Sequence, residues 1–372
     1  MKTRRTLLSL LLALALTLSV SLTAAAAPDA KGYEAVTYSD GHTVLLHNGT
    51  QAATYTGAYE APDGTTWYFE NGIAPTGTDI RWLTSKNEQN WWYLNNGKVD
   101  RTHTGVDHNA AGWWRVENGK VNFNFKGVAK NAAGHWYLTG GKVDFNHTGV
   151  EYGEGAWWRI KNGKADESYN GIAKNDAGYW VIQNGNVNFK FTGLFFNKAD
   201  GYWWYAKGGK VLLDYNGVEH NDAGWWAVRN GKVDFKFNGA AENAAGWWLI
   251  ENGKVNFNYT GARYVTVKNV TAWWRIENGK INQTFNGLAS NEAGWWFFKE
   301  GKVDFSYTGL CRNQAGIWYI NKGKVDFTYN ATVKATDGKT YTIKNGKVVT
   351  DPAGNPTSGT ASNTSSNSTA KR

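Results

Sequence analysis

Cysteine, methionine and proline are almost absent from this sequence: its 372 residues include one cysteine, one methionine and five prolines. A single cysteine, Cys311, excludes a disulfide framework. Recognisable catalytic motifs are also missing, among them G-x-S-x-G, H-E-x-x-H and the phosphate-binding glycine loop. The sequence therefore predicts that the chain is not an enzyme and that it has no cofactor and no metal site.

Concentrated charge is missing as well, although the formal net charge is +9. Lys2, Arg4 and Arg5 at the start and Lys371 and Arg372 at the end supply part of this excess. Between them Lys and Asp alternate, whereas nucleic-acid binding needs a concentrated basic stripe. Nucleic acid is therefore not an expected partner.

Long apolar runs are confined to the start of the chain. A basic segment, an apolar run and a cleavage site of small residues predict that residues 1–26 are an export signal. No second apolar segment follows, so the mature chain is expected to have no transmembrane segment. Residues 351–372 are rich in Ser, Thr and Asn, which predicts a disordered tail.

What the sequence has in excess is tryptophan, with 21 residues, and glycine, with 44. Asn118-Gly119 lies between two runs in which apolar and polar residues alternate, which is a strong signal for a β-hairpin with a type I′ turn. We call the glycines at this place the turn glycines, and we name each copy of the repeat after its turn glycine. They are Gly97, Gly119, Gly141, Gly163, Gly185, Gly209, Gly231, Gly253, Gly279, Gly301, Gly323 and Gly346. Most are 22 residues apart, a period that indicates a repeat architecture.

The Gly119 copy shows the hairpin that we predict. Because side chains alternate across a strand, one face is expected to be apolar and buried. Its residues are Trp114, Val116, Val121, Phe123 and Phe125. On the other face, Trp113 is expected opposite Asn124. A lone hairpin is only marginally stable in water, so the apolar face must be covered by neighbouring copies.

The predicted fold is therefore all-β: a β-solenoid of stacked hairpins, with about 22 residues per copy and roughly 11–13 copies. The array is expected to be regular over residues 91–350. Residues 27–90 are predicted to be degenerate capping copies, since Pro62 and Pro75 interrupt the strand pattern. Two connections, Phe195–Gly201 and Arg263–Thr271, are two and four residues longer than usual and are expected to bulge from a continuous array.

Charged residues and histidines follow the same period. Asp recurs three residues after the turn glycine and Lys one residue after it, which predicts a solvated strand face with cross-strand charge pairing. His103 and His147 replace Phe or Tyr and are expected to be partly buried. His108 and His220 are expected in connecting loops.

Two tryptophan positions precede each turn. The inner Trp, five residues before the turn glycine, is predicted to be structural because it is Trp in every copy from Trp67 to Trp318. The outer position, six residues before the turn glycine, tolerates His135 and Ile317 and should face solvent, where an indole can stack on a sugar ring or enclose a cation. The alternative is that these indoles pack between successive hairpins. The candidate ligand-binding residues at the outer position are Trp91, Trp113, Trp157, Tyr179, Trp203, Trp225, Trp247, Trp273 and Trp295.

The hairpin motif, as in Trp91–Val99 and Trp136–Val143, resembles the W-Y-Y-L-x-x-x-G-x-M hairpin of cell-wall-binding repeats. These repeats include choline-binding and glucan-binding modules of Gram-positive bacteria. The resemblance covers about residues 67–349 and implies a β-solenoid whose ligands are held by aromatic residues of consecutive hairpins. It implies further candidate ligand-binding residues at the third motif position, namely Tyr93, Tyr137, Tyr205 and Tyr319.

One departure from that family bears on the ligand. The family usually has Gly-Trp after the second strand, and that Trp helps to form the choline cage, whereas this chain has Gly127-Val128 and Gly309-Leu310 there. We therefore expect a cell-wall polysaccharide or teichoic acid to be bound multivalently, with a glycan favoured over choline. The expected protein is secreted, cell-wall associated and non-catalytic. The alternative is a structural or adhesive surface protein that binds other proteins or itself through its aromatic array.

Overall fold

A computed structural model describes residues 22–25 and 27–350. The chain forms two compact units, residues 1–188 (unit 1) and residues 189–372 (unit 2). Every regular element in the described residues is a β-strand, which confirms the all-β repeat prediction. No helix in this part of the chain is long and apolar enough to cross a membrane. The predicted tail and all but residues 22–25 of the predicted export signal lie outside the described residues.

Unit 1 contains β1 (Leu22–Ala25), β2 (Tyr33–Tyr38), β3 (Thr43–His47), β4 (Thr50–Gln51), β5 (Gly57–Glu60), β6 (Thr66–Phe69), β7 (Thr78–Ser85), β8 (Glu88–Asn95), β9 (Lys98–Val99), β10 (Gly105–Asn109), β11 (Gly112–Glu117), β12 (Lys120–Val121), β13 (Gly127–Asn131), β14 (Gly134–Thr139), β15 (Lys142–Val143), β16 (Gly149–Gly153), β17 (Ala156–Lys161), β18 (Lys164–Ala165), β19 (Gly171–Asn175), β20 (Gly178–Gln183) and β21 (Asn186–Val187). The first four strands form a small sheet of their own in the order β1-β2-β3-β4.

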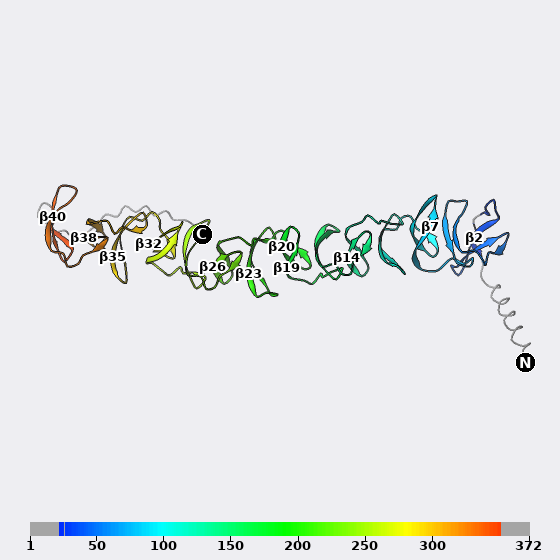
Figure 1. Cartoon of the computed structure of the whole chain (residues 1–372), viewed down its shortest axis with the longest axis horizontal. Coiled ribbons are helices and arrows are strands. Elements are labelled where there is room, and N and C mark those ends of the chain that lie inside the picture. The colour runs from blue at the N-terminus through cyan, green and yellow to red at the C-terminus, as the bar shows by residue number, and fades with distance from the viewer. Residues whose placement is uncertain (1–21, 26, 351–372) are drawn as a thin grey trace, which may run out of the picture. The chain divides into compact units, whose positions relative to one another are not determined.

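Unit 2 contains β22 (Gly193–Asn197), β23 (Tyr202–Lys207), β24 (Lys210–Val211), β25 (Gly217–Asn221), β26 (Gly224–Arg229), β27 (Lys232–Val233), β28 (Gly239–Asn243), β29 (Gly246–Glu251), β30 (Lys254–Val255), β31 (Gly261–Val267), β32 (Val270–Glu277), β33 (Lys280–Ile281), β34 (Gly287–Asn291), β35 (Gly294–Lys299), β36 (Lys302–Val303), β37 (Gly309–Asn313), β38 (Gly316–Asn321), β39 (Lys324–Val325), β40 (Ala331–Lys334), β41 (Thr340–Lys344) and β42 (Lys347–Thr350). Copies follow one another in chain order, as β32, β35 and β38 do (Figure 1).

Each regular copy has three strands. In the Gly119 copy, β10 pairs antiparallel with β11, and β11 pairs with the two-residue β12. Positive φ angles at Asn118 (50°) and Gly119 (77°) confirm the turn that the Asn-Gly pair predicts. Each copy therefore has one strand more than the predicted hairpin, and this additional first strand leads into the strand that carries the tryptophan pair.

This first strand changes the register of the outer position. Trp113 lies opposite His108 rather than Asn124, because the chain turns away from the ladder after Val121. His108 and its equivalent His220 consequently lie in β10 and β25, not in connecting loops.

The early end of the return strand also corrects the predicted apolar face. Phe123 lies beyond β12 and is 43% exposed, so it does not share the buried face of Val116 and Val121. Its ring instead meets the Trp114 ring edge-on, with centroids 5.7 Å apart. The equivalent phenylalanines in other copies are exposed in the same way, and they include Phe145, Phe235, Phe257, Phe305 and Phe327.

Within each unit, backbone hydrogen bonds join successive copies through the turn glycine. The Gly253 carbonyl accepts a bond of 2.8 Å from the Ala227 N–H, and the Gly253 N–H donates one of 2.8 Å to the Phe237 carbonyl. In unit 1, Gly141 makes the same two bonds, with Arg115 and Phe125. The turn that closes one copy is thus bonded to the copy before it.

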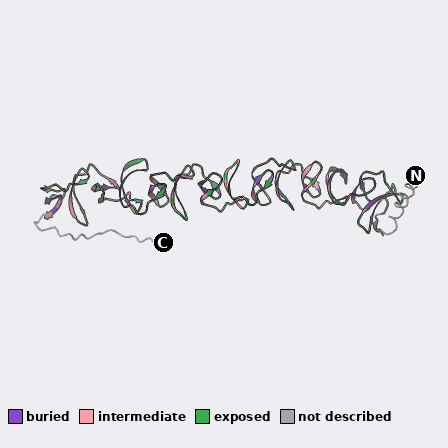
Figure 2. Cartoon of the chain, turned by 90° about the horizontal axis from the view of Figure 1, so that it is seen from below, coloured by how far each residue is buried: buried purple, intermediate pink, exposed green. Residues whose placement is uncertain are grey.

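The core lies between successive copies. Ile250 and Val255 of the Gly253 copy pack against Val218 and Ala227 of the Gly231 copy, and Ile250 is fully buried. Buried segments recur in this way in both units (Figure 2). Both faces of a regular copy are therefore covered, one by the preceding copy and the other by the following copy.

Ring stacking adds to this packing at the residue four before the turn glycine. Tyr93 stacks on His103 at 3.7 Å between ring centroids, and Tyr137 stacks on His147 at 3.9 Å. The two imidazoles are 27% and 26% exposed, which confirms the prediction that these histidines are partly buried.

The predicted cross-strand pairing of Lys and Asp is wrong. Asp100 accepts hydrogen bonds from the Thr102 N–H (2.9 Å) and hydroxyl (2.7 Å), which hold the pKa of the Asp100 carboxyl below its usual value. The lysine after the turn glycine reaches the other way, so that the Lys142 ammonium lies 5.2 Å from the ring of Trp114 in the preceding copy. Here Asp caps its own turn, and Lys covers an indole of the copy before.

The two insertions behave differently. Phe195–Gly201 lengthens the turn between β22 and β23, as expected. The residues added in Arg263–Thr271 do not bulge, because β31 and β32 remain paired up to Val267 and Val270. Positive φ angles at Lys268 (48°) and Asn269 (65°) close this longer hairpin with a two-residue turn.

Two constraints favour glycine at the turn position: the positive φ and the lack of space for a side chain. A pair of variants can separate the two. Gly253 and Gly201 both have φ of +75°, but a Cβ at Gly253 would lie 2.5 Å from the Asp234 carbonyl oxygen, whereas at Gly201 nothing lies within 4 Å. We expect Gly201→Ala to cost about 1–2 kcal/mol, the strain of a left-handed residue. Gly253→Ala should lower the free energy of unfolding in urea by clearly more. Equal losses would mean that the neighbouring copy yields to the added methyl group.

Candidate ligand-binding surface

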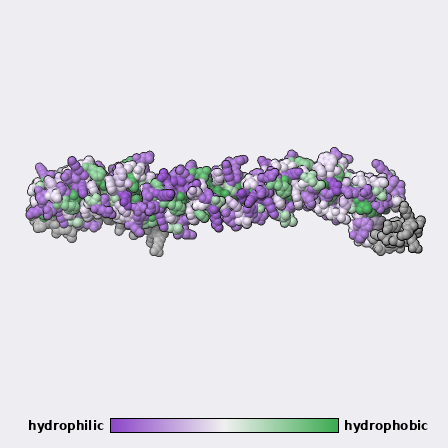
Figure 3. Space-filling model, turned by 60° about the horizontal axis from the view of Figure 1, so that its bottom comes forward, coloured by the Kyte–Doolittle hydropathy of each residue, from purple (hydrophilic) through white to green (hydrophobic). Residues whose placement is uncertain are grey.

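Several outer residues pair across the first hairpin with a second, exposed aromatic residue. The pairs are Trp82–Trp91, His108–Trp113, Tyr152–Trp157, Phe196–Trp203, His220–Trp225 and Tyr264–Trp273, with ring centroids 4.6–6.2 Å apart. On the face shown in Figure 3, apolar patches recur within hydrophilic surroundings. The outer position is thus part of a two-ring surface in these copies.

The first residue of each pair is one that sequence reasoning missed. Its distance from the outer residue depends on the length of the intervening turn: Trp113 follows His108 by five residues, whereas Trp273 follows Tyr264 by nine. In the sequence, these residues are marked only by being aromatic and by lying in the connection before the tryptophan pair. Their pairing with the outer residue can be predicted only once this connection is known to form a strand.

The structure places the predicted site residues in two environments. Tyr179, Trp225 and Trp273 are exposed, and the other outer residues Trp91, Trp113, Trp157, Trp203, Trp247 and Trp295 are half-buried. The tyrosines at the third motif position lie inside: Tyr93, Tyr137 and Tyr205 are buried and Tyr319 is half-buried. Burial raises the pKa of all four phenols. Each of these four rings lies against the ring of the residue ten positions later, so it offers little face to a ligand.

The inner Trp is fixed by polar contacts on two sides. The Trp226 indole N–H donates to Asn221 Oδ1 at 3.0 Å, and the same oxygen accepts the Ala223 N–H at 3.0 Å. The Lys254 ammonium of the next copy lies 5.2 Å from the Trp226 ring. Asn221 thus bonds to both the indole and the hairpin turn, and the indole ring lies near a lysine ammonium of the same chain.

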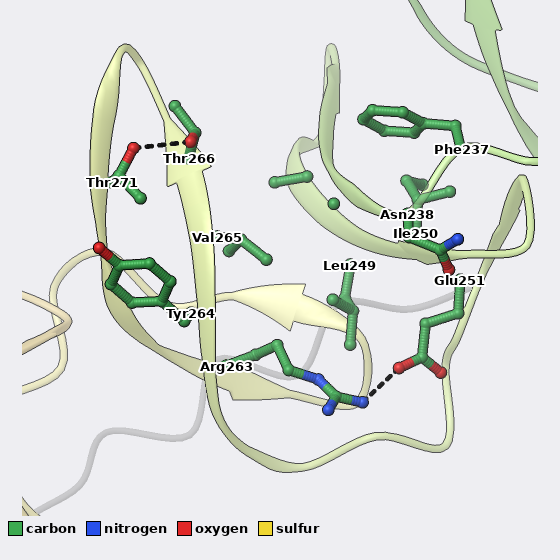
Figure 4. A pocket seen from close by; sticks show the side chains of 12 residues that line it. Phe237, Asn238, Leu249, Ile250, Glu251, Arg263, Tyr264, Val265, Thr266 and Thr271 are labelled. Atoms are coloured by element: carbon green, nitrogen blue, oxygen red, sulfur yellow. Dashed lines mark hydrogen bonds and ion pairs between the residues drawn. The ribbon is translucent and has the colours of Figure 1, made fainter.

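Three wide grooves of unit 2 lie between the first hairpins of successive copies. One lies between the β28–β29 hairpin and the longer β31–β32 hairpin, with a volume of about 540 Å³ (Figure 4). Leu249 and Val265 form an apolar part of the groove wall, and Arg263 makes an ion pair with Glu251. Tyr264 is 58% exposed, so its ring offers a face to the groove.

The other two grooves have an outer Trp in place of Tyr264. One of about 540 Å³ is lined by Trp203, Leu194 and His220, and one of about 630 Å³ by Trp295, Leu288 and Arg312. Each therefore combines an outer indole, an aliphatic residue and polar side chains from the tip of the next hairpin. Flat rings with nearby hydrogen-bonding groups suit a sugar ring, which has both apolar and hydroxyl-bearing faces.

A narrow pocket of about 190 Å³ lies beside the outer Trp273. It is walled by Trp273, by the inner Trp296 of the next copy and by Phe305, which meets Trp296 edge-on at 5.8 Å. Three aromatic side chains therefore surround it without the Gly-Trp tryptophan that the sequence lacks. The Lys324 ammonium lies 5.2 Å from the Trp296 ring, so this indole already interacts with a cation.

Within the described residues, no group of three or more His, Cys, Asp or Glu side chains is placed to hold a metal ion. His103 and His147 instead each contact a single carboxylate, Asp107 at 2.6 Å and Glu151 at 2.8 Å.

Comparison with known proteins identifies the kind of repeat. The family model described as choline-binding repeat matches ten segments, namely 84–100, 104–122, 124–144, 147–166, 168–188, 214–234, 236–256, 266–282, 284–304 and 306–326. The chain belongs to this family of binding repeats, as the hairpin motif suggests. No curated protein matches the chain.

Among solved structures, the chain is similar to an alternansucrase in complex with isomaltononaose. The two are 15% identical over 84% of this chain and 23% of that chain, with a TM-score of 0.23. This chain therefore spans less than a quarter of the length of that enzyme.

The two tryptophan positions should differ in stability. Trp226→Ala removes an indole that donates a hydrogen bond to Asn221 and packs in the cluster of Leu194 and Tyr205 of the preceding copy. We therefore expect a loss of about 3 kcal/mol, at the low end for a large core aromatic because Trp226 is half-buried. Trp225→Ala should cost about 1 kcal/mol or less, since its ring is exposed. Urea titrations of both variants measure this. Equal destabilisation would make the outer indole part of the core.

Proposed function

We propose that this chain is a secreted, non-catalytic protein that attaches to a cell-wall or surface polysaccharide through many weak sites between successive hairpins. The observation that carries this proposal is the recurrence of the wide groove, in which an aromatic residue of a first hairpin lies beside polar side chains: outer Trp203 and Trp295 in two grooves and the exposed Tyr264 in the third. Membership of the choline-binding repeat family supports a role in binding a wall polymer. Export through residues 1–26 is part of the proposal.

Many weak sites on one chain can give firm attachment. Once one groove holds a polymer, the next groove meets the same polymer at a high effective concentration, which can raise avidity about 10²–10⁴-fold over a single site. Repetition, rather than one deep pocket, is therefore the proposed source of affinity.

The aromatic residues that line the three grooves should matter most. We expect Trp203→Ala, Tyr264→Ala and Trp295→Ala together to weaken binding to purified wall polysaccharide by about tenfold or more, because three sites are lost from one chain. The measurement is sedimentation of the protein with the polysaccharide over a range of concentrations. The matched control changes Phe235, Phe257 and Phe305 to Ala. These are also exposed aromatics but lie outside the three grooves, and they should leave glycan binding nearly unchanged.

A second candidate ligand is a compact organic cation such as the choline of a teichoic acid. The narrow pocket with its three aromatic walls favours it. Against it, the Lys324 ammonium near the Trp296 ring repels a second positive charge.

Competition decides between the two ligands. We expect a glycan fragment to displace the protein from isolated walls and millimolar choline to displace it poorly. Release by choline alone, together with loss of binding in the Phe235, Phe257 and Phe305 control, would assign the narrow pocket as the principal site. A protein that ignores walls and associates with itself as its concentration rises would support the adhesive alternative.

A further inference from the structure

We propose that the chain closes one of its own narrow pockets: His135 and Glu167 fill, between the Gly141 and Gly163 copies, the place that is open between the Gly279 and Gly301 copies. The inference rests in one respect on the second candidate ligand of the proposed function, namely that the narrow pocket is able to bind an organic cation. Closure of the pocket itself depends only on the side chains of this chain and requires no ligand.

The two places correspond residue by residue. His135 is at the outer position, where the open pocket has Trp273, and the inner Trp158 corresponds to Trp296. Glu167 lies four residues after its turn glycine, as Phe305 does. The closed pocket therefore differs from the open one at two of its three aromatic walls.

Those two replacements contact each other over the third wall. The His135 ring stacks on the Trp158 ring with centroids 3.9 Å apart and planes 24° apart. His135 Nδ1 lies 2.8 Å from Glu167 Oε1, and the imidazole is only 18% exposed. A planar ring thus covers the indole face at the place where, in the open pocket, Trp273 and Phe305 leave a cavity.

The surroundings of Trp158 suit this internal occupant. Trp114 and Trp296 each lie near a lysine ammonium of the next copy. Trp158 is paired instead with Asn186, which carries no charge. The imidazole lies against the indole face and the Glu167 carboxylate, and no ammonium stands at that neighbouring position.

A second interface in unit 1 follows the same rule with different residues. Thr66 lies six residues before Gly72, which with Asn71 forms a turn of the same kind, and Arg101 lies four residues after Gly97. The Arg101 guanidinium lies 5.0 Å from the inner Trp92 ring and donates to the Thr66 hydroxyl at 3.3 Å. The Ser85 hydroxyl joins the two, since it donates to Thr66 at 2.7 Å and accepts from Arg101. In both interfaces, polar side chains that bond to one another beside the inner indole replace the aromatic pair.

Residue choice at the outer position and at the position four after the turn glycine therefore determines whether an interface is open. Between the Gly279 and Gly301 copies the aromatic pair Trp273 and Phe305 leaves a cavity for a ligand, whereas the hydrogen-bonded pair His135 and Glu167 occupies the equivalent place. The chain thus limits the number of its ligand sites by side chains that fill them, without interrupting the stack of hairpins.

Reciprocal variants test this proposal. The opening variant is His135→Trp with Glu167→Phe, and the closing variant is Trp273→His with Phe305→Glu. Each introduces only residues that other copies tolerate at the same positions. Choline chloride is the probe, and equilibrium dialysis counts the choline bound per chain. We expect the opening variant to bind one more choline than the parent and the closing variant one fewer. A closing variant that loses a site while the opening variant gains none would overturn the proposal.

A second measurement needs no ligand. Ring currents of Trp158 should shift the imidazole C–H resonances of His135 upfield of those of a free histidine, and Trp158→Leu should remove the shift. Imidazole resonances at free-histidine positions in the parent would overturn closure directly. If neither the parent nor any variant binds choline, the choline candidate for the narrow pocket is wrong. The upfield shift then decides on its own whether His135 occupies the interface.

Discussion

Each turn glycine approaches the backbone of the preceding copy so closely that no side chain fits between them. At Gly253 this approach brings two backbone hydrogen bonds, to Ala227 and Phe237, and the remaining contacts of the copy depend on it. The apolar residues Ile250 and Val255 reach Val218 and Ala227 only because the turn is fixed at that distance. Glycine at this place is thus needed twice, once for a positive φ and once for the approach.

Because cohesion comes from backbone bonds and small aliphatic side chains, the aromatic residues at the edge of each copy are free to differ. The outer position holds Trp in most copies, but also His135, Tyr179 and Ile317, while the hairpins around it keep the same pairing. Variation at such positions changes what an interface can bind without changing how copies stack. Open and self-filled interfaces can therefore exist in one fold.

The indoles also show how the chain uses its own cations. A lysine one residue after the turn glycine covers the inner Trp of the copy before, with 5.2 Å between the Lys142 ammonium and the Trp114 ring. This contact accounts for the regular row of lysines, of which Lys120 also makes an ion pair with Glu88. It also means that inner indoles such as Trp296 already lie near a cation, which is the physical reason for preferring a glycan in the wide grooves over choline in the narrow pocket.

The sequence by itself determined the repeat, its type I′ turns and the stacking of copies, because these depend on local signals. Asn118-Gly119 sets a turn whatever surrounds it, and the alternation of Val116 and Val121 with polar residues sets the buried face. The burial of His103 and His147 followed from the same register, since they stand where other copies have aromatic rings.

Only the tertiary structure decided where the strands end and what lies across from the outer position. The chain leaves the ladder after Val121, and no local signal marks that point, so Phe123 is exposed and Trp113 meets His108. The tyrosines at the third motif position look like surface residues within one hairpin, but the next copy buries them. Contacts between copies 22 residues apart in the chain are set by how hairpins stack, and a single hairpin does not encode them.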